Sequence, residues 1–431
     1  MRYESIGKEL FVLNRKRLLK EIPRNSLVVV NANDVMPTNA DGTTRFRQNS
    51  DLFYLTGVDQ EETILVLAPD FPDKKYREVL FIRETSEEIA TWEGQKLTRE
   101  QATEVTGIST VVWTSEFHRL FNMLMLVGNV ERVFLNTNEH YRADVEVESR
   151  DARFIKWCRQ KYPLHQYARL APIMHRLRSI KSKRELELMQ RAVDITEQAF
   201  RRVLKFVKPG VKEYEIEAEY MHEFLREGSR GFAYEPIIAS GANSCVLHYI
   251  RNSEVCRDGD ILLLDVGAEY ANYNADLTRT IPVNGRFSPR QKEVYNAVRR
   301  VHRKAISMLA PGVQYYEYHK EVQKIIEAEL VRLKLIDKTD IRRQDPARPL
   351  FMKYFMHGTG HMLGLDVHDV GSMYQRMEPG MVWTVEPGIY IREEGLGVRI
   401  ENNVVITPKG SRDLMKNIPV EAEEIEDLMN S

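Results

Sequence analysis

The chain has 431 residues, which is long enough for two domains that each bury a core of their own. Its 62 basic and 63 acidic residues nearly cancel, so the composition lacks the basic excess that is typical of nucleic-acid binders. No apolar run reaches the length of a membrane span, the first residues lack the apolar stretch of a signal peptide, and three scattered cysteines are too few for a disulfide framework. We therefore expect a cytoplasmic protein that has no nucleic-acid or membrane partner.

The first part of the chain, up to about residue 170, alternates apolar runs with polar helical stretches. The runs that have the pattern of strands are residues 26–30, 63–67 and 132–135. Strands that alternate with helices predict an α/β layer.

A long helix is predicted to open the second part. Ser182 and Glu185 have the spacing of a capping box, an apolar face follows, and the Pro-Gly pair at residues 209–210 ends the pattern. These signals predict an N-terminal domain of residues 1–174 and a second domain of residues 175–431.

The second domain contains an internal repeat. Another helix opens at Ser288 with a cap and a first-turn proline, and it too ends at a Pro-Gly pair, after which residues 311–317 resemble residues 209–215. In both halves a glycine is followed six residues later by a carboxylate: Asp265 after Gly259 and Glu386 after Gly380. Two related halves that each deliver a carboxylate from a strand end would surround one shared cleft.

Five residues of this second domain have the side chains of a metal site: Asp265, Asp276, His361, Glu386 and Glu401. Each lies in a segment that has the pattern of a strand or a strand end. Four carboxylates and one imidazole suit a pair of hard-to-borderline divalent cations. Two such cations can share a hydroxide and clamp a reacting oxygen, so the pattern indicates a hydrolase.

Simpler interpretations exist for single members of this set. A lone Asp265 at a strand end is usually a turn residue or a cap. Asp276, in contrast, lies between Ala275 and Leu277, which favours burial, and a buried carboxylate needs a partner such as a cation. A hairpin would bring the two aspartates together.

Three histidines, His357, His361 and His368, fall within twelve residues of one glycine-rich segment. Glycines allow the backbone to approach a ligand closely, whereas the alternative is a loop whose histidines are incidental. The glycines of this segment do not have the spacing of a dinucleotide-binding loop. The sequence also lacks an HExxH motif, which argues against a single-zinc protease. His248 stands alone on an apolar segment, where a histidine is more often part of the core. Arg399 shares one strand face with Glu401 and could orient carboxylates.

Together these segments resemble the pita-bread metallopeptidases, which include aminopeptidase P, prolidase, creatinase and methionine aminopeptidase. The resemblance covers about residues 175 to 425 and rests on LLLDVG, NADLTRT, MHGTGHMLGLDVHDVG, TVEPG and VRIEN, in the order of the family. Residues 45–57 resemble the N-terminal domain of aminopeptidase P and prolidase. The resemblance implies an α/β (α+β) protein, with an N-terminal creatinase/prolidase-like domain followed by a pita-bread catalytic domain of two pseudo-symmetric halves.

Bacterial aminopeptidase P is the member that these motifs resemble most. It implies a proline-specific metalloprotease that removes the N-terminal residue from peptides whose second residue is proline, with a hydroxide bridging two divalent cations, usually Mn²⁺. The resemblance also implies a homodimer or homotetramer. The alternatives are prolidase, which cleaves Xaa-Pro dipeptides with the same residues, a non-enzymatic pita-bread binding module, and creatinase, which needs no metal.

The residue roles that the resemblance implies fall into three groups. Asp265 and Asp276 would hold one metal, Asp276 and Glu401 would bridge to the second, and His361 and Glu386 would complete it. The implied catalytic residues are Glu386 as proton shuttle, His357 and His368 as donors to the reacting carbonyl, and His248 beside the proline pocket. The implied substrate-binding residues are Asp51 for the free amino group, Tyr234, Arg399, Trp92 and Arg150. Two departures, Gly360 where the family often has serine and a short stretch at residues 392–396, affect the rim of the cleft.

Overall fold

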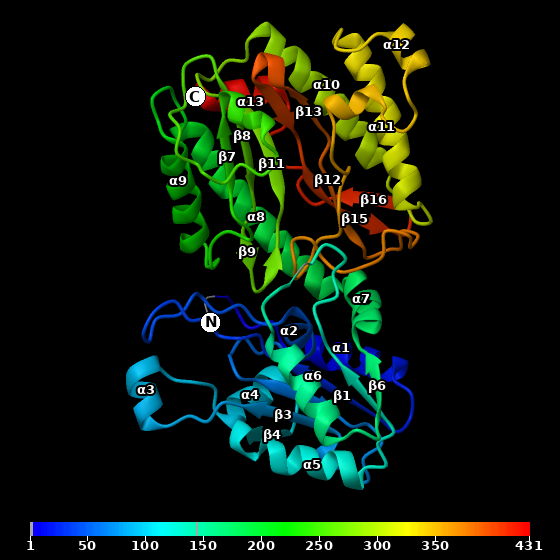
Figure 1. The fold of residues 1–431 in the computed structure, drawn as a ribbon. Helices are drawn as coiled ribbons and strands as arrows, with labels where there is room; N and C mark the ends of the chain where they lie inside the picture. Colours follow the sequence, from blue (N-terminus) through cyan, green and yellow to red (C-terminus); the bar gives the residue numbers. More distant parts are fainter. Residues whose placement is uncertain (1–2, 144) are drawn as a thin grey trace. The chain divides into compact units, whose positions relative to one another are not determined.

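The computed structural model describes residues 3–143 and 145–431, which form two compact units (Figure 1). The N-terminal unit comprises Glu4–Arg178, and the C-terminal unit comprises Ser179–Ser431 together with residue 3. The division falls a few residues beyond the boundary expected at residue 174. Across the described ranges, no helix combines the length and the apolar character that crossing a membrane requires.

The N-terminal unit is a mixed six-stranded sheet with helices on it. Its strands are β1 (Ser26–Asn31), β2 (Ile64–Leu67), β3 (Glu78–Ile82), β4 (Thr110–Trp113), β5 (Arg132–Leu135) and β6 (Gln166–Arg169), in the spatial order β4-β3-β2-β1-β5-β6. Its helices are α1 (Lys8–Glu21), α2 (Ser50–Thr56), α3 (Glu87–Glu93), α4 (Arg99–Thr106), α5 (Phe117–Val127), α6 (Arg150–Lys161) and α7 (Ala171–Ser179), with short 3₁₀ turns η1 (Lys74–Tyr76) and η2 (Thr114–Glu116).

The core of this unit lies between the sheet and the apolar sides of α5 and α6. Leu27 and Val29 of β1 pack with Phe121 of α5 and Cys158 of α6, and all four side chains are buried. Every residue of β1 is buried, because the strand lies inside the sheet with neighbours on both edges. The three strands expected from apolar runs are confirmed as β1, β2 and β5.

The C-terminal unit combines two pairs of long helices with several small antiparallel sheets. Its helices are α8 (Lys183–Phe206), α9 (Glu213–Arg226), α10 (Pro289–Met308), α11 (Tyr315–Arg332), α12 (Lys338–Arg343) and α13 (Ala422–Met429), with the 3₁₀ turns η3 (Gly241–Cys245), η4 (Leu350–Lys353) and η5 (Arg392–Glu394). Its strands are β7 (Ile237–Ser240), β8 (Ile261–Val266), β9 (Glu269–Tyr270), β10 (Tyr273–Asn274), β11 (Leu277–Pro282), β12 (Val382–Val385), β13 (Gly388–Ile391), β14 (Leu396–Arg399), β15 (Asn402–Thr407) and β16 (Gly410–Asp413).

Both predicted capping boxes are present. Ser182 and Glu185 satisfy each other's backbone N–H groups at the start of α8, and Ser288 does the same with Gln291 at the start of α10. Pro289 occupies the first turn of α10, where a proline needs no hydrogen-bond donor. Local sequence therefore determines where the two longest helices of this unit begin.

The expected internal repeat is confirmed by matching backbone contacts. After α8, the Gly210 N–H donates to the carbonyl of Cys256 at 2.9 Å, and after α10 the Gly312 N–H donates to Met377 at 2.8 Å. In return, the Cys256 N–H donates to the carbonyl of Val211 and the Met377 N–H donates to the carbonyl of Val313, both at 2.8 Å. Both glycines have positive φ, at 96° and 86°, a conformation that other residues rarely adopt.

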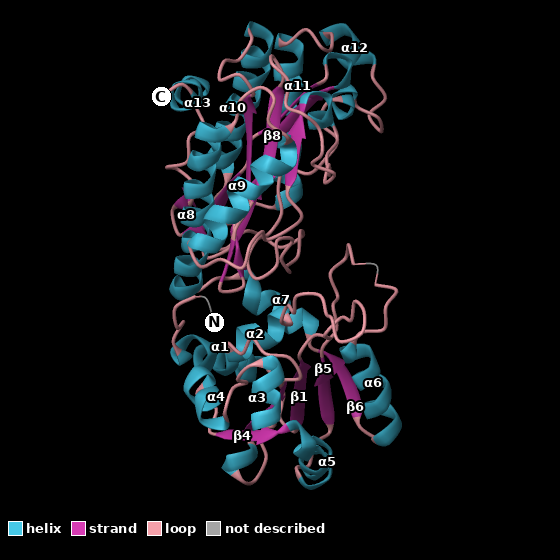
Figure 2. Cartoon of the chain, turned by 90° about the vertical axis from the view of Figure 1, so that its left-hand side faces the viewer, coloured by secondary structure: helices cyan, strands magenta, loops and turns pink. Residues whose placement is uncertain are grey.

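Each half consists of one helix pair beside one sheet. Figure 1 shows α8 and α9 beside β7, β8 and β11, and α10 and α11 beside β12, β15 and β16. The view in Figure 2 shows α8 and α9 running along one side of the unit. The expected α/β architecture of two pseudo-symmetric halves is therefore confirmed.

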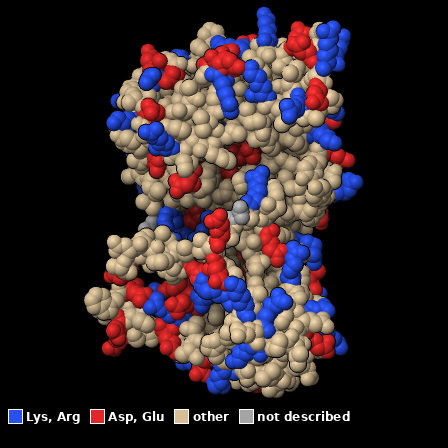
Figure 3. Space-filling view, viewed as in Figure 1, with Lys and Arg blue, Asp and Glu red and all other residues tan. Residues whose placement is uncertain are grey.

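Charged side chains of both signs are interspersed over the face in Figure 3. This agrees with the balanced composition of 62 basic and 63 acidic residues.

Candidate metal centre

Acidic and imidazole side chains from both halves converge in the C-terminal unit. Asp276, His361 and Glu401 each offer a ligand atom, and these atoms lie within 4.8 Å of one another. Asp265 adjoins the group, because the Tyr234 hydroxyl lies 2.6 Å from carboxylate oxygens of both Asp265 and Asp276.

Glu386 completes the set of five expected ligands. Its Oε1 lies 3.7 Å from His361 Nε2, which is in turn 3.4 Å from Asp276 Oδ2. The structure thus brings all five residues to one place.

Strand pairing explains how the aspartates and Glu401 meet. Asp265 lies in β8 directly opposite Thr278 of β11, and Asp276 immediately precedes β11. Glu401, between β14 and β15, forms an isolated bridge with the same Thr278, and the two residues also share a backbone hydrogen bond of 3.0 Å. One residue of β11 therefore fixes the separation of carboxylates that are far apart in the sequence.

His361 and Glu386 lie in neighbouring segments held together by their backbones. The Glu386 N–H donates to the carbonyl of Thr359 at 2.9 Å, and the Thr384 N–H donates to the carbonyl of His361 at 2.8 Å. A Cβ on Gly360 would lie 2.0 Å from the Thr384 carbonyl oxygen, so no other residue fits this backbone. His361 itself lies in an irregular segment, and Glu386 directly follows β12.

Burial makes the charged forms of these carboxyl groups unfavourable. It raises the pKa of Asp265, raises that of Glu386 to about 7 and raises that of Glu401 well above its ordinary value, with repulsion from neighbouring carboxylates adding to the effect. Burial lowers the pKa of His361, but its hydrogen bond to Asp276 and the negative charge of Glu386 outweigh this and raise it to about 8.

The protein itself supplies little positive charge to this acidic group. Arg399 donates from Nη2 to Asp265 Oδ2 at 2.6 Å, and His361 is the second cationic group in contact with the carboxylates. Closely spaced buried carboxylates need more positive charge than this, and a set of four carboxylates and one imidazole suits two divalent cations. The donor set therefore fits a dinuclear metal centre.

Three polar residues that the sequence reading had not assigned to the site hold these groups in place. Thr278 donates its hydroxyl to Glu401 Oε2 at 2.7 Å, and Asn403 pairs with the backbone of Asp276 through both its donor and its acceptor. The Tyr390 hydroxyl accepts a 2.8 Å bond from Arg399 Nη1. Thr278 lies inside the NADLTRT motif, but nothing in the sequence assigns Tyr390 to the site.

His357 is held by partners on both ring nitrogens. Its Nδ1 lies 2.8 Å from the carbonyl of Gly358 and its Nε2 lies 2.8 Å from the Tyr390 hydroxyl. A carbonyl can only accept, so Nδ1 carries the proton. Burial and the charge of Arg399 lower the pKa of His357 to about 3, which keeps the ring neutral.

The other two expected histidines lie at the edge of the centre. His368 is exposed, and its ring centroid lies 4.3 Å from that of His361. His248 is exposed as well, so it is not a core histidine.

The remaining expected residues belong to the N-terminal unit. Asp51, in the first turn of α2, is paired with Arg178 at 2.8 Å. Trp92 on α3 is 83% exposed. Arg150 opens α6, and its backbone N–H donates to Asp34 at 2.7 Å. Their contacts with substrate stay a prediction.

Comparison with protein families decides what this centre belongs to. Residues 187–408 match the model described as metallopeptidase family M24, and residues 11–134 match the aminopeptidase P N-terminal domain. The chain belongs to metallopeptidase family M24. Both matches lie where the resemblance had been expected, so the expected family is confirmed.

Similarity to individual proteins of known sequence or structure covers nearly the whole chain. The "Xaa-Pro aminopeptidase" of Escherichia coli (strain K12) is 36% identical over 443 residues and covers 98% of each chain. The structure of Pseudomonas aeruginosa aminopeptidase PepP has a TM-score of 0.90 at 32% identity, covering 100% of this chain and 99% of that one. A zinc-substituted E. coli aminopeptidase P in complex with product has a TM-score of 0.87 at 34% identity, covering 99% of each chain.

Proposed function

We propose that this protein is a metal-dependent aminopeptidase that removes the N-terminal residue from peptides with proline in the second position. The observation that carries the proposal is the convergence of the five expected ligand side chains in a chain that aligns end to end with an Xaa-Pro aminopeptidase. The N-terminal domain match separates this chain from family members that lack that domain.

We propose that two divalent cations occupy the centre and that manganese is the metal in the cell. Asp265 and Asp276 would hold the first, Asp276 and Glu401 would bridge, and His361 and Glu386 would complete the second. Bound there, the cations would lower the pKa of water and so make hydroxide available near neutral pH. The zinc-substituted relative supports divalent metal binding without deciding which metal this chain uses.

Glu386 is the group best suited to move a proton. Its carboxylate oxygens lie 3.7 Å from His357 Nδ1 and 3.7 Å from His361 Nε2, and a carboxyl group in this position can both accept and return a proton. The proline nitrogen of a substrate carries no hydrogen, so it leaves only after it is protonated. Glu386 would take a proton from water and deliver it to that nitrogen.

Arg399 and Tyr390 would orient the groups around the reacting carbonyl. Arg399 binds Asp265, Thr278 and Tyr390 through three different nitrogens, which fixes its planar head. Tyr390 in turn holds His357, so the neutral imidazole keeps one direction. We propose that His357 and His368 donate to the substrate carbonyl and that His248 borders the proline, which requires His357 to exchange one of its present partners.

Substrate recognition is proposed for five further residues: Asp51, Tyr234, Arg399, Trp92 and Arg150. Asp51 carries the charge that a free amino group needs, although it is paired with Arg178. Tyr234 contacts two proposed ligands directly. We further propose a cytoplasmic homodimer or homotetramer, which light scattering coupled to size-exclusion chromatography would test.

The experiment compares three peptides with the manganese-loaded protein: an Xaa-Pro-Xaa tripeptide, an Xaa-Ala-Xaa tripeptide and an Xaa-Pro dipeptide. We expect release of the first residue from the proline tripeptide and little cleavage of the alanine tripeptide. Cleavage confined to the dipeptide would make the protein a prolidase. Cleavage of neither proline peptide would contradict the proposal.

Glu386→Ala tests the proposed proton shuttle in the same assay. Activity should fall close to background while circular dichroism and the melting temperature show a folded protein. A variant that retains most of its activity would disprove the role of Glu386.

A further inference from the structure

In the segment between His357 and His361, one residue has a side chain that can form a hydrogen bond to the rest of the protein. Residues 358 and 360 are glycines, and the residue between them is Thr359. A Cβ on Gly358 would lie 2.8 Å from the Tyr315 hydroxyl, and one on Gly360 would lie 2.0 Å from a carbonyl oxygen. Because larger residues do not fit at either glycine, any side-chain anchor for this segment must act through Thr359, which is fully buried.

That anchor is His319 of α11. His319 Nδ1 lies 2.7 Å from Thr359 Oγ1, and Gln323 Nε2 lies 2.8 Å from His319 Nε2. An amide nitrogen can only donate, so His319 Nε2 accepts and the ring proton resides on Nδ1, from where it donates to Thr359. Burial lowers the pKa of His319, which favours this neutral form.

Aromatic packing keeps the His319 ring in that orientation. The ring lies parallel to Tyr315, with centroids 5.9 Å apart, and Tyr315 is stacked on Trp383 of β12 at 5.3 Å. The ring of Phe355 contacts both histidines, with centroids 6.1 Å from His319 and 4.8 Å from His357. The packed rings therefore connect α11 to the strand before Glu386 and to the catalytic histidine.

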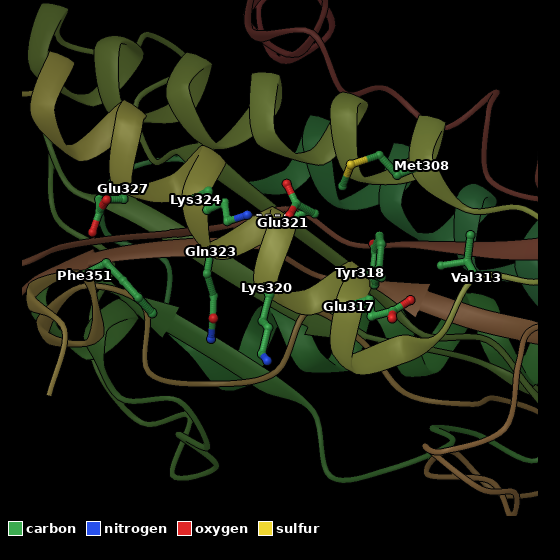
Figure 4. Close-up of a pocket in the computed structure, with 10 residues that line it drawn as sticks. All are labelled: Met308, Val313, Glu317, Tyr318, Lys320, Glu321, Gln323, Lys324, Glu327 and Phe351. Carbon is green, nitrogen blue, oxygen red and sulfur yellow. Dashed lines mark hydrogen bonds and ion pairs between the residues drawn. The ribbon is translucent and has the colours of Figure 1, made fainter. Parts of the chain in front are cut away.

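Gln323, the partner of His319 Nε2, borders a cavity and is not part of the proposed metal centre. Gln323, which is half-buried, lines a cavity of about 630 Å³ together with Tyr318, Lys320 and Phe351 (Figure 4). A change at Gln323 can therefore test the state of His319 without touching a proposed metal ligand.

We propose that His319 is a positioning residue for peptide hydrolysis: its Nδ1–H holds Thr359, and through it the backbone that carries His357 and binds Glu386. The link to Glu386 is direct, because the Thr359 carbonyl accepts the Glu386 N–H at 2.9 Å. The inference rests on the proposed peptidase function. His319 is not among the residues that the sequence predicts for the site, and its hydrogen-bond and ring partners within the described part of the chain include none of the five expected ligands.

The test separates the hydrogen bond from the shape of the ring. His319→Phe keeps a flat ring but removes the donor, whereas His319→Asn removes the ring and can place an amide N–H where Nδ1 was. For Phe we expect kcat on the Xaa-Pro-Xaa tripeptide to fall about tenfold, equivalent to about 1.4 kcal/mol, with little change in KM or melting temperature. Asn should restore kcat to within about threefold of the wild type, because a single donor is what the loop requires.

His302→Phe is the matched control. His302 is a buried histidine of the neighbouring helix α10, and its Nδ1 lies 3.4 Å from Arg299 Nη1, so its replacement should leave kcat unchanged. An equal loss in His302→Phe, an unchanged kcat in His319→Phe, or an Asn variant as impaired as Phe would each overturn the proposal.

A measurement without substrate distinguishes this proposal from the proposed function. Nitrogen-15 NMR of the histidine side chains in the full-length protein should show His319 with its proton on Nδ1, and Thr359→Val or Gln323→Leu should shift that signal. Failure of the wild type to cleave the tripeptide would refute the proposed function. The spectrum would still test, without substrate, whether the Nδ1–H of His319 holds Thr359. A proton on Nε2 would refute the positioning role.

Discussion

Asp151 of the N-terminal unit should make this unit less stable as the pH rises. The side chain lies in the first turn of α6, is 8% exposed, and accepts a 2.8 Å hydrogen bond from Asn31. Burial, followed by repulsion from Asp51, raises its pKa from 3.8 to about 7. The folded protein therefore binds the Asp151 proton more tightly than the unfolded chain does.

The size of the effect follows from this pKa difference. Between pH 4 and pH 7 the folded state keeps a proton that the unfolded state has lost, so stability is full below pH 4 and falls until pH 7. Between pH 5 and pH 8 the loss amounts to about 3 kcal/mol, with about 1.4 kcal/mol for each tenfold change in proton affinity. Asp151→Asn cannot ionise, and its amide oxygen can accept the same bond from Asn31, so the variant should lack this loss.

Urea unfolding of the wild type and Asp151→Asn at pH 5 and pH 8 measures the difference. Three of the four tryptophans, Trp92, Trp113 and Trp157, lie in the N-terminal unit, so tryptophan fluorescence mainly reports the unfolding of this unit. From pH 5 to pH 8 the free energy of unfolding of Asp151→Asn should rise by about 3 kcal/mol relative to that of the wild type. The exposed control Asp70→Asn should show no such relative rise. An equal free-energy difference at both pH values would refute the reasoning.

Two further sites in the C-terminal unit, the Lys181–Asp369 ion pair and Arg399, provide the remaining tests. Lys181 and Asp369 form an ion pair of 3.1 Å whose side chains are both 1% exposed, so Lys181→Met should cost about 3–5 kcal/mol in urea unfolding by leaving a buried charge. The double variant Lys181→Met/Asp369→Leu should recover much of that loss, and no recovery would contradict the pairing argument. Arg399→Lys replaces three nitrogens by one, which cannot reach Asp265, Thr278 and Tyr390 together, so metal affinity, measured by calorimetry, should fall about 10- to 100-fold. Unchanged affinity would show that Arg399 does not orient Asp265.

Local signals in the sequence were sufficient for much of the fold. The boxes at Ser182 and Ser288 specify helix starts through contacts three residues apart, and the Pro-Gly pairs specify the ends. The repeat could be recognised because both halves use the same glycine conformations, at Gly210 and Gly312. The carboxylates among the five expected ligands could be selected from the sequence because such residues are unusual in apolar, strand-like segments, and metal binding by the five stays a prediction.

Contacts between distant segments were not readable in the same way. Thr278 joins Asp265 and Glu401 through strand register, which depends on how separate strands align. The Nε2 partner of His357 is Tyr390 of β13, 33 residues later, and His319 reaches Thr359 from a helix 40 residues earlier. Each of these depends on tertiary packing, and no spacing rule in the sequence encodes it.

The measurement that tests the central claim most directly is metal reconstitution of the full-length protein. The protein would be stripped with a chelator and titrated with Mn²⁺ while release of the first residue from an Xaa-Pro-Xaa tripeptide is followed, with Asp276→Asn in parallel. We predict no activity without metal, full activity near two equivalents, and little recovery in the variant, whose substitution removes the carboxylate that we propose bridges the two cations. Full activity in the metal-free protein, or full recovery of Asp276→Asn, would contradict the proposed dinuclear centre.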